Sequence, residues 1–321
     1  MTATRPEHFT LGIVIPCYNE EEVLPKLLAA LEKFIGEAPY AIRVLFVDDG
    51  SRDRTEELLC AACSRQPAYA YLRFSRNFGH QTAVTAGLAH IPGEVIGVID
   101  ADLQDPLEAL AGMVEKWRAG YDVVYGVRKN RKEGLLLRFA YAAFYRLLKK
   151  MANIEIPLDS GDFCVMDRRV VDVINAMPEH NRFIRGLRGW AGFRQIGFPY
   201  DRAARAAGKT KYTISRLLKL AFDGMISFSS VPLRLASLLG VLAALLGMVY
   251  LGYAVVVKIL DPAAPIGWAS TIAVIIFFGG IQLIVLGIIG EYLGRIFDET
   301  KRRPLYLIDR TGGWLGGTAP R

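Results

Sequence analysis

The chain has 321 residues, room for one sizeable globular domain and an appendage. Hydrophobic residues make up 52% of it, a share that is high for a wholly soluble protein, and the formal net charge is +7. The four cysteines fit a reducing compartment, and the Cys60–Cys63 pair lies in a predicted helix without a second pair, which argues against a zinc or redox site.

The first 130 residues alternate strand-like and helix-like segments, a pattern typical of an α/β domain with a largely parallel sheet. Ligands of such sheets bind beyond the carboxyl ends of the strands, so residues directly after the apolar runs are the candidates for a site. We expect strands at 11–15, 43–47, 69–74, 95–99 and 122–127, and helices at 20–34, 54–64, 82–89 and 106–119.

Two later segments, 134–152 and 213–232, mix apolar and basic residues and are candidates for helices in the membrane interface. Packing of either segment on the globular domain is an equal alternative. The surrounding chain is strongly basic, with eight Lys/Arg and one acid in 128–150, and ten Lys/Arg and one acid in 182–219. Because these blocks precede an apolar hairpin, lipid headgroups and phosphates are favoured over nucleic acid as their ligands.

Two stretches without a charged residue follow, at 235–257 and 262–290. At about 1.5 Å per residue, each can cross a hydrocarbon core about 30 Å thick. We therefore expect membrane spans at 233–258 and 266–292. A cytoplasmic tail at 293–321 would follow, and its last ten residues, rich in Gly, are expected to be loose.

Lys and Arg flank the outer ends of both spans, whereas the loop between them offers only Lys258. By the positive-inside rule, both termini and the large domain of residues 1–212 lie in the cytoplasm, at an inner or plasma membrane. Gly279, Gly280 and Gly287 permit close helix packing, so assembly into a homo-oligomer stays open. The flanking basic residues are Arg216, Lys219, Arg234, Arg295, Lys301, Arg302 and Arg303.

Three of the predicted strands end in acidic segments, 16–20 (PCYNE), 48–51 (DDGS) and 100–106 (DADLQDP). An Asp-x-Asp after a strand brings two carboxylates together, and a divalent cation would relieve their repulsion. Hard oxygen ligands suit Mg²⁺ or Mn²⁺, which could bridge the diphosphate of a nucleotide. Asp105 is expected only to cap the next helix, and His80 to be a structural or capping residue rather than a base.

These segments resemble family 2 glycosyltransferases of the dolichyl-phosphate mannose synthase type. Segments 160–167, 182–195 and 205–212 resemble the bacterial branch with a two-span C-terminal hairpin, which includes bactoprenol glucosyl transferases and the undecaprenyl-phosphate aminoarabinose transferase. The resemblance runs in order from about Leu11 to Arg303. It is carried by 15–20 (IPCYNE), 47–55 (VDDGSRDRT), 75–81 (SRNFGHQ), 100–106 (DADLQDP), 160–167 (SGDFCVMD), 182–195 (RFIRGLRGWAGFRQ) and 205–212 (RAAGKTKY).

The resemblance implies a Rossmann-like α/β domain of the GT-A fold. It also implies inverting transfer of one sugar from a nucleotide-sugar, UDP-glucose first, to undecaprenyl or another polyprenyl phosphate in the lipid bilayer. Asp162 matches a position often proposed as the catalytic base. By resemblance, Pro16, Tyr18, Glu20, Asp49, Ala101 and Gln104 contact the nucleotide. Asp100, Asp102 and Gln104 gather around the metal and diphosphate, Arg128 and Arg138 hold the acceptor phosphate, and Arg205 and Lys211 clamp phosphate from a mobile loop.

The acceptor chemistry argues against a base, because the second pKa of a phosphate monoester is about 6 and its oxygen is itself the nucleophile near neutral pH. Our hypothesis is that Asp162 orients the donor sugar or an Arg. A processive polysaccharide synthase is disfavoured, since Gln195 is not part of a Gln-x-x-Arg-Trp motif and only two spans are present. A non-catalytic sugar-nucleotide-binding protein is disfavoured by the intact Asp100 and Asp102.

Overall fold

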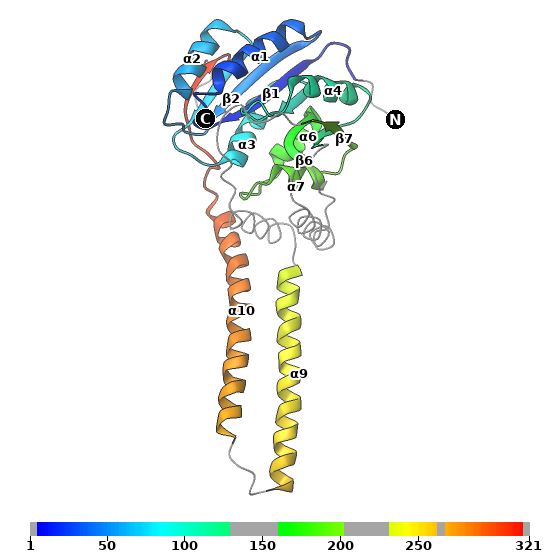
Figure 1. Cartoon of the computed structure of the whole chain (residues 1–321), viewed down its shortest axis with the longest axis vertical. Coiled ribbons are helices and arrows are strands. Elements are labelled where there is room, and N and C mark those ends of the chain that lie inside the picture. The colour runs from blue at the N-terminus through cyan, green and yellow to red at the C-terminus, as the bar shows by residue number, and fades with distance from the viewer. Residues whose placement is uncertain (1–4, 129–159, 202–230, 262–266, 317–321) are drawn as a thin grey trace. The chain divides into compact units, whose positions relative to one another are not determined.

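The computed structural model describes residues 5–128, 160–201, 231–261 and 267–316. They divide into two units, an α/β unit that includes the residues from Arg303 onward and a hairpin of two long helices (Figure 1). The predicted interfacial helix at 134–152 lies outside the described residues, and so does the second, at 213–232, except for its last two residues, which begin the first helix of the hairpin.

The α/β unit is built on one eight-stranded sheet with the order β7-β5-β6-β4-β1-β2-β3-β8. Strands β4, β1, β2 and β3 run parallel, β6 is antiparallel to both of its neighbours β4 and β5, β7 is parallel to β5, and β8 is antiparallel to β3. The strands are β1 (Thr10–Cys17), β2 (Ala41–Asp48), β3 (Tyr69–Phe74), β4 (Val95–Val98), β5 (Val123–Arg128), β6 (Ser160–Asp167), β7 (Gln195–Tyr200) and β8 (Ile308–Gly313).

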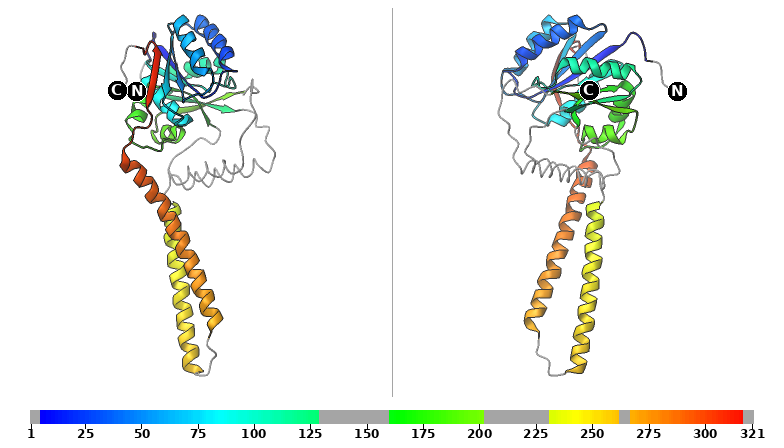
Figure 2. Two further views of the ribbon diagram at one scale, coloured as in Figure 1. Left: turned by 90° about the vertical axis from the view of Figure 1, so that its left-hand side faces the viewer. Right: turned by 45° about the vertical axis from the view of Figure 1, so that its right-hand side comes forward.

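Helices cover both faces of this sheet (Figures 1 and 2). On one face lie α1 (Leu24–Glu37), α2 (Thr55–Arg65) and α4 (Leu107–Arg118), and on the other α3 (His80–His90), α6 (Arg168–Ala176) and α7 (Ile184–Trp190). The strands and helices predicted for the first 130 residues are confirmed, although α1 begins four residues later than expected.

Alternation along β1 explains how the sheet is covered on both sides. Leu11, Ile13 and Ile15 are fully buried on the face that α1 and α4 cover, because successive side chains of a strand point to opposite faces. Val14 points the other way, toward α3. Gly87 of α3 permits this close approach, since a Cβ there would overlap the Val14 side chain.

The residues beyond the hairpin form a further strand of the sheet, Ile308–Gly313. The first two of the ten C-terminal residues expected to be loose are therefore part of it, and 317–321 lie outside the described residues. Gly312 and Gly313 pair with β3. Gly313 has φ +68°, and a Cβ there would overlap the carbonyl oxygen of Tyr69, so only glycine fits. Just ahead of β8, the ring of Tyr306 stacks on Phe74 with a 5.1 Å centroid distance. The C-terminal strand is therefore an integral edge of the α/β unit.

The hairpin consists of α9 (Val231–Leu260) and α10 (Trp268–Lys301), which lie side by side (Figure 2). Within them, 233–257 and 271–301 are long and apolar enough to cross a membrane. Helix α10 runs nine residues past the predicted end of the second span at 292. Gly247 lets the two helices approach, since a Cβ there would lie 3.1 Å from the Phe278 ring.

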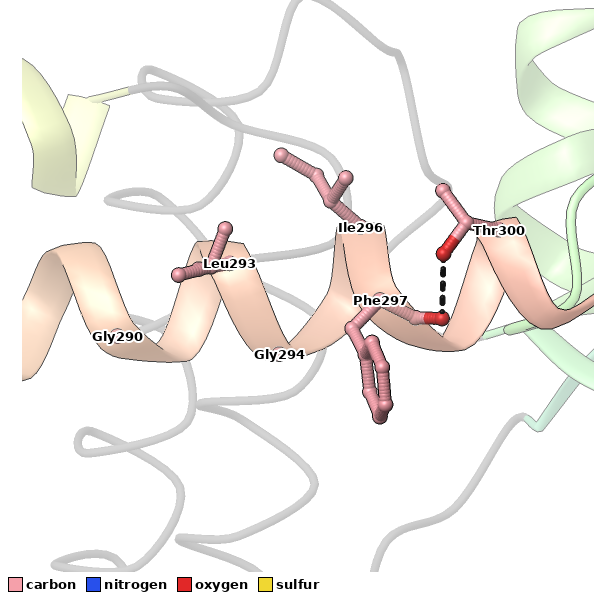
Figure 3. Close-up of a pocket in the computed structure, with 6 residues that line it drawn as sticks. All are labelled: Gly290, Leu293, Gly294, Ile296, Phe297 and Thr300. Atoms are coloured by element: carbon pink, nitrogen blue, oxygen red, sulfur yellow. Dashed lines mark hydrogen bonds between the residues drawn. The ribbon is translucent and has the colours of Figure 1, made fainter.

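The end of α10 carries a shallow apolar depression (Figure 3). Two of its residues are glycines, which leave the helix surface without side chains. Nearby, Glu291 and Arg295 form an ion pair one helical turn apart, with Arg295 Nη2 3.4 Å from Glu291 Oε1. The depression is lined by Gly290, Leu293, Gly294, Ile296, Phe297 and Thr300.

Candidate active site

Six of the eight strands bring candidate site residues to one edge of the sheet. Strands β1, β2, β4, β5 and β7 run in one direction and end there, and antiparallel β6 begins there. Because ligands bind beyond this edge in such sheets, the flanking residues form the candidate site. They are 18–20 after β1, 49–51 after β2, 100–105 after β4, Arg128 and Tyr200 at the ends of β5 and β7, and 160–162 at the start of β6.

The register between β4 and β6 brings two carboxylates together. Val98 pairs with Cys164, and continuing this antiparallel register by two residues places Asp100 opposite Asp162. His80 joins them, with its Nε2 3.3 Å from Asp162 Oδ2 and 3.8 Å from Asp100 Oδ1. The predicted capping role of His80 is wrong, because the N-cap of α3 is the preceding glycine and the ring faces the carboxylates.

Asp162 is the centre of a hydrogen-bonded network. Its side chain is 8% exposed and accepts from Arg185 Nε at 2.8 Å, from Arg185 Nη2 at 3.2 Å and from Gln81 Nε2 at 3.0 Å. Gln81 Oε1 in turn accepts from the backbone N–H of Ile184 at 3.0 Å. One carboxylate thus ties together α3, β6 and α7.

The same contacts keep Asp162 ionised. Burial alone would raise the pKa of Asp162, but the hydrogen bond from His80 and the charge and hydrogen bonds of Arg185 outweigh burial and hold that pKa well below its usual range. Burial would lower the pKa of His80, and the nearby carboxylates more than reverse this, so the pKa of His80 is raised. Asp162 is therefore an anion near neutral pH and a weak proton acceptor.

The loop after β4 offers donors that fit a divalent cation. Burial raises the pKa of Asp100 to about 6, and the charges of Asp162 and Asp105 act in the same direction, against His80. The Gln104 side chain is buried, and its Oε1 has no hydrogen-bond partner among the described residues. A crowded carboxylate and an unsatisfied amide oxygen are hard donors of the kind Mg²⁺ or Mn²⁺ prefers.

This donor set is incomplete by itself. The described part of the chain contains no group of three His, Cys, Asp or Glu side chains arranged around one metal position. Asp102 shapes the loop, because its Oδ1 accepts from the backbone N–H of Gln104 at 3.1 Å. With Asp100, Asp102 and Gln104 as protein ligands, the remaining positions would fall to a diphosphate and water.

The loops after β1 and β2 are tied to each other. The backbone N–H of Asn19 donates to Ser51 Oγ at 2.9 Å, and that of Glu20 donates to Thr55 Oγ1 at 2.9 Å. Asn19 has φ +54°, which turns the chain sharply after the strand. Tyr18 is 42% exposed beside this junction, so its ring face is available for stacking.

Asp49 supports the segment that leads into α3. Its buried carboxylate accepts from the backbone N–H of Phe78 at 2.6 Å and of Gly79 at 2.9 Å. Pro16 and Ala101 are buried beside the same strand ends. The nucleotide contacts expected of these residues remain predictions.

The sequence predicted that Asp105 caps α4. This is wrong, because the N-cap of α4 is Pro106. Asp105 is buried and accepts from the Tyr200 hydroxyl at 2.6 Å. Arg128 ends β5 as the register partner of Tyr200. The other predicted phosphate ligands, Arg138, Arg205 and Lys211, lie outside the described residues.

Comparison with known families decides the kind of site. The family described as glycosyl transferase family 2 matches residues 12–174, and the GtrB C-terminal hairpin matches residues 231–296. The chain is a family 2 glycosyltransferase. This confirms the resemblance and the two-helix hairpin expected from the sequence, and the mixed α/β sheet agrees with the expected GT-A fold.

The glycosyltransferase has relatives of nearly its own length. It is 45% identical to the uncharacterised glycosyltransferase YkcC of Bacillus subtilis over 95% of both chains. It is 40% identical to a prophage bactoprenol glucosyl transferase homolog of Escherichia coli over 94% of this chain and 98% of that one. It is 38% identical to the bactoprenol glucosyl transferase of Shigella phage SfX over 93% and 98%. Among solved structures, mannosyl-3-phosphoglycerate synthase from Rubrobacter xylanophilus is similar over 67% and 71%, with a TM-score of 0.46 and 15% identity.

Proposed function

We propose that this glycosyltransferase moves one sugar from a nucleotide-sugar to a polyprenyl phosphate, with inversion at the anomeric carbon. One observation carries the proposal: relatives named for bactoprenol glucosyl transfer match 93–94% of this chain, hairpin included. UDP-glucose is the first candidate donor, and UDP-N-acetylhexosamine and UDP-aminoarabinose follow. Undecaprenyl phosphate is the first candidate acceptor.

A polyprenyl phosphate carries its own nucleophile. The second pKa of a phosphate monoester is about 6, so the acceptor is largely dianionic at neutral pH. An acceptor oxygen attacks the anomeric carbon, the bond from that carbon to the diphosphate breaks, and the nucleoside diphosphate leaves with the bonding electrons. No side chain has to remove a proton, which agrees with the lowered pKa of Asp162.

Asp162 acts in this scheme as an orienting group. Arg185 and Gln81 hold its carboxylate in place next to Asp100, where an anion can accept hydrogen bonds from hydroxyls of the donor sugar. The Arg185 guanidinium also adds positive charge where an anionic donor meets an anionic acceptor. Arg128 supplies further positive charge for the acceptor phosphate.

The metal proposal rests on the donors of the loop after β4. Asp100, Asp102 and Gln104 would hold Mg²⁺ or Mn²⁺, which would offset negative charge on the departing diphosphate. The rest of the work falls to the protein, which orients the donor through Asp162 and the acceptor through Arg128.

The hairpin supports a lipid acceptor, because an enzyme anchored in the bilayer meets a membrane lipid without releasing it to water. The charge distribution supports a cytoplasmic active site, since basic residues flank the outer helix ends and the connecting loop offers only Lys258.

The test is a transfer assay with purified full-length protein, undecaprenyl phosphate, Mg²⁺ or Mn²⁺, and a panel of radiolabelled nucleotide-sugars. We expect a chloroform-soluble product carrying one sugar, formed from one donor, lost in EDTA and absent with Asp102→Asn. A polymeric product would support a processive synthase instead. Nucleotide binding without any labelled lipid would move the assignment to a binding protein.

A further inference from the structure

Tyr200, the last residue of β7, lies at the site edge without an assigned role. It is 5% exposed and is the register partner of Arg128 in the parallel β5–β7 pair. Its ring packs edge-on against Phe163 at a centroid distance of 5.1 Å. Gly126 leaves room for that ring, since a Cβ there would lie 2.7 Å from Tyr200 Cε1. Packing therefore fixes where the hydroxyl points.

The Tyr200 hydroxyl interacts with the Asp105 carboxylate and lies on the strand next to Arg128. It donates its proton to Asp105 Oδ1 at 2.6 Å, which leaves its lone pairs free to accept. Arg128 is the register partner of Tyr200, and its charge opposes burial and Asp105, which together raise the pKa of Tyr200. Arg128 Nη2 also comes within 3.7 Å of the place a Cβ on Gly161 would take. The guanidinium thus lies between Tyr200 and the residue before Asp162.

We propose that Tyr200 is a positioning residue for the acceptor phosphate, because its hydroxyl, held by Asp105, fixes the Arg128 guanidinium at the sheet edge. The inference rests on the proposed function, which gives Arg128 a phosphate to bind. When one side of an Arg guanidinium is held in place, its remaining N–H groups point in a fixed direction. This favours two parallel hydrogen bonds to a phosphate.

The same hydroxyl links the two halves of the reaction. Asp105 directly follows the loop of Asp100, Asp102 and Gln104, which faces the donor diphosphate in the proposed mechanism. Through Tyr200 that loop is joined to the acceptor side at Arg128. In this proposal the hydrogen bond from Tyr200 to Asp105 links the donor loop to Arg128, and so helps to set the distance between the attacking phosphate and the anomeric carbon.

Tyr200→Phe tests this role, because it removes the hydroxyl and keeps the ring. Tyr69→Phe is the matched control: Tyr69 is fully buried, and its hydroxyl has no hydrogen-bond partner among the described residues. In full-length protein we expect Tyr200→Phe to raise the KM for undecaprenyl phosphate about tenfold, with the KM for the nucleotide-sugar within about twofold of wild type. Tyr69→Phe should leave both constants unchanged.

An unchanged acceptor KM in Tyr200→Phe would overturn the proposal, and so would equal rises in both KM values, which indicate a general loss of structure. The variant Arg128→Lys adds a second test. Lys lacks the guanidinium that Tyr200 holds in the proposal, so the effects of Tyr200→Phe and Arg128→Lys on the acceptor KM should not be additive. Additive effects would count against a coupling between Tyr200 and Arg128. A wild type that forms no glycolipid from any donor removes the proposed function, whereas an active wild type with an unaltered Tyr200→Phe removes only the role of Tyr200.

Discussion

Replacing Asp162 with Asn separates an orienting role from a general-base role. The Asp162 side chain is 8% exposed, and the change leaves Arg185 without this ionic partner. Removing one partner of a buried ion pair costs about 3–5 kcal/mol. Because the Arg185 side chain is 31% exposed and can turn toward water, we expect a loss of about 2 kcal/mol. In a domain of this size that lowers the midpoint of thermal unfolding by about 4–8 °C.

The kinetic expectation for Asp162→Asn is a fall in turnover of about tenfold or less, because a lost general base costs about 10²–10⁴-fold. The pKa of Asp162 is depressed, so its stabilisation is present above the unfolded value of about 3.9 and is lost only as the pH falls toward the folded value. The rate profile of the variant should therefore gain no limb that rises with pH. Asp162→Asn also removes one cause of the raised pKa of His80 and of Asp100, so the difference in unfolding temperature from wild type should change with pH where those two groups titrate, from about pH 5 up to the raised pKa of His80, and should be constant above that range. Glycolipid formation measured against pH is the assay. A loss above about 10²-fold that recovers as the pH rises would refute the reasoning.

Asp167→Asn is the matched control for this experiment. Asp167 lies at the other end of β6, is equally buried, and pairs with Arg5 and Arg169. It should lose thermal stability to a similar degree without any change in the kinetic constants. A similar loss of activity in both variants would mean that stability alone explains the effect of Asp162→Asn.

Two further substitutions probe the C-terminal strand, with thermal unfolding of the full-length protein as the measurement. Gly313→Ala should lower the free energy of unfolding by about 2 kcal/mol or more, because a Cβ would overlap the Tyr69 carbonyl at a positive φ. Gly36→Ala in α1, where the space around the glycine is open, should raise it by about 0.5–1 kcal/mol. Equal effects of the two substitutions would contradict this geometry. Arg310→Ala should shift the midpoint by no more than about 1 °C, since Arg310 is 62% exposed and its ion pair with Glu56 is open to water; a larger fall would show that this pair holds β8.

Local pattern predicted much of the α/β unit, because each buried run of a strand or helix is contiguous in the sequence. Helix α1 begins four residues later than expected, and Pro25 in its first turn is a local signal for that start. The backbone N–H of Glu20 is bound by Thr55, 35 residues further along, and the residues after Glu20 form a turn before the helix begins. A contact between the loop after β1 and the first residue of α2 holds the turn that precedes the helix.

The acidic residues of the site were predictable, since they directly follow apolar runs, but their supporting partners were not. Gln81 and Arg185 lie within segments that carry the family resemblance, yet they are 81 and 23 positions from Asp162. Tyr200 is 95 positions from Asp105. Such partnerships depend on which strands become neighbours, and only the register of the folded sheet supplies that information.

The C-terminal strand was missed for the same reason, because its polar and Gly-rich sequence has no apolar alternation and its partner β3 precedes it by more than 200 residues. This topology imposes an order on biosynthesis. The chain passes through both apolar helices between β7 and β8, so the ribosome releases the last strand only after the two membrane spans are made. Until then β3 exposes unpaired N–H and C=O groups, an open template for another chain. A nascent chain that stalls during membrane insertion would therefore aggregate through this sheet edge, which makes aggregation of the α/β unit a reporter of failed insertion.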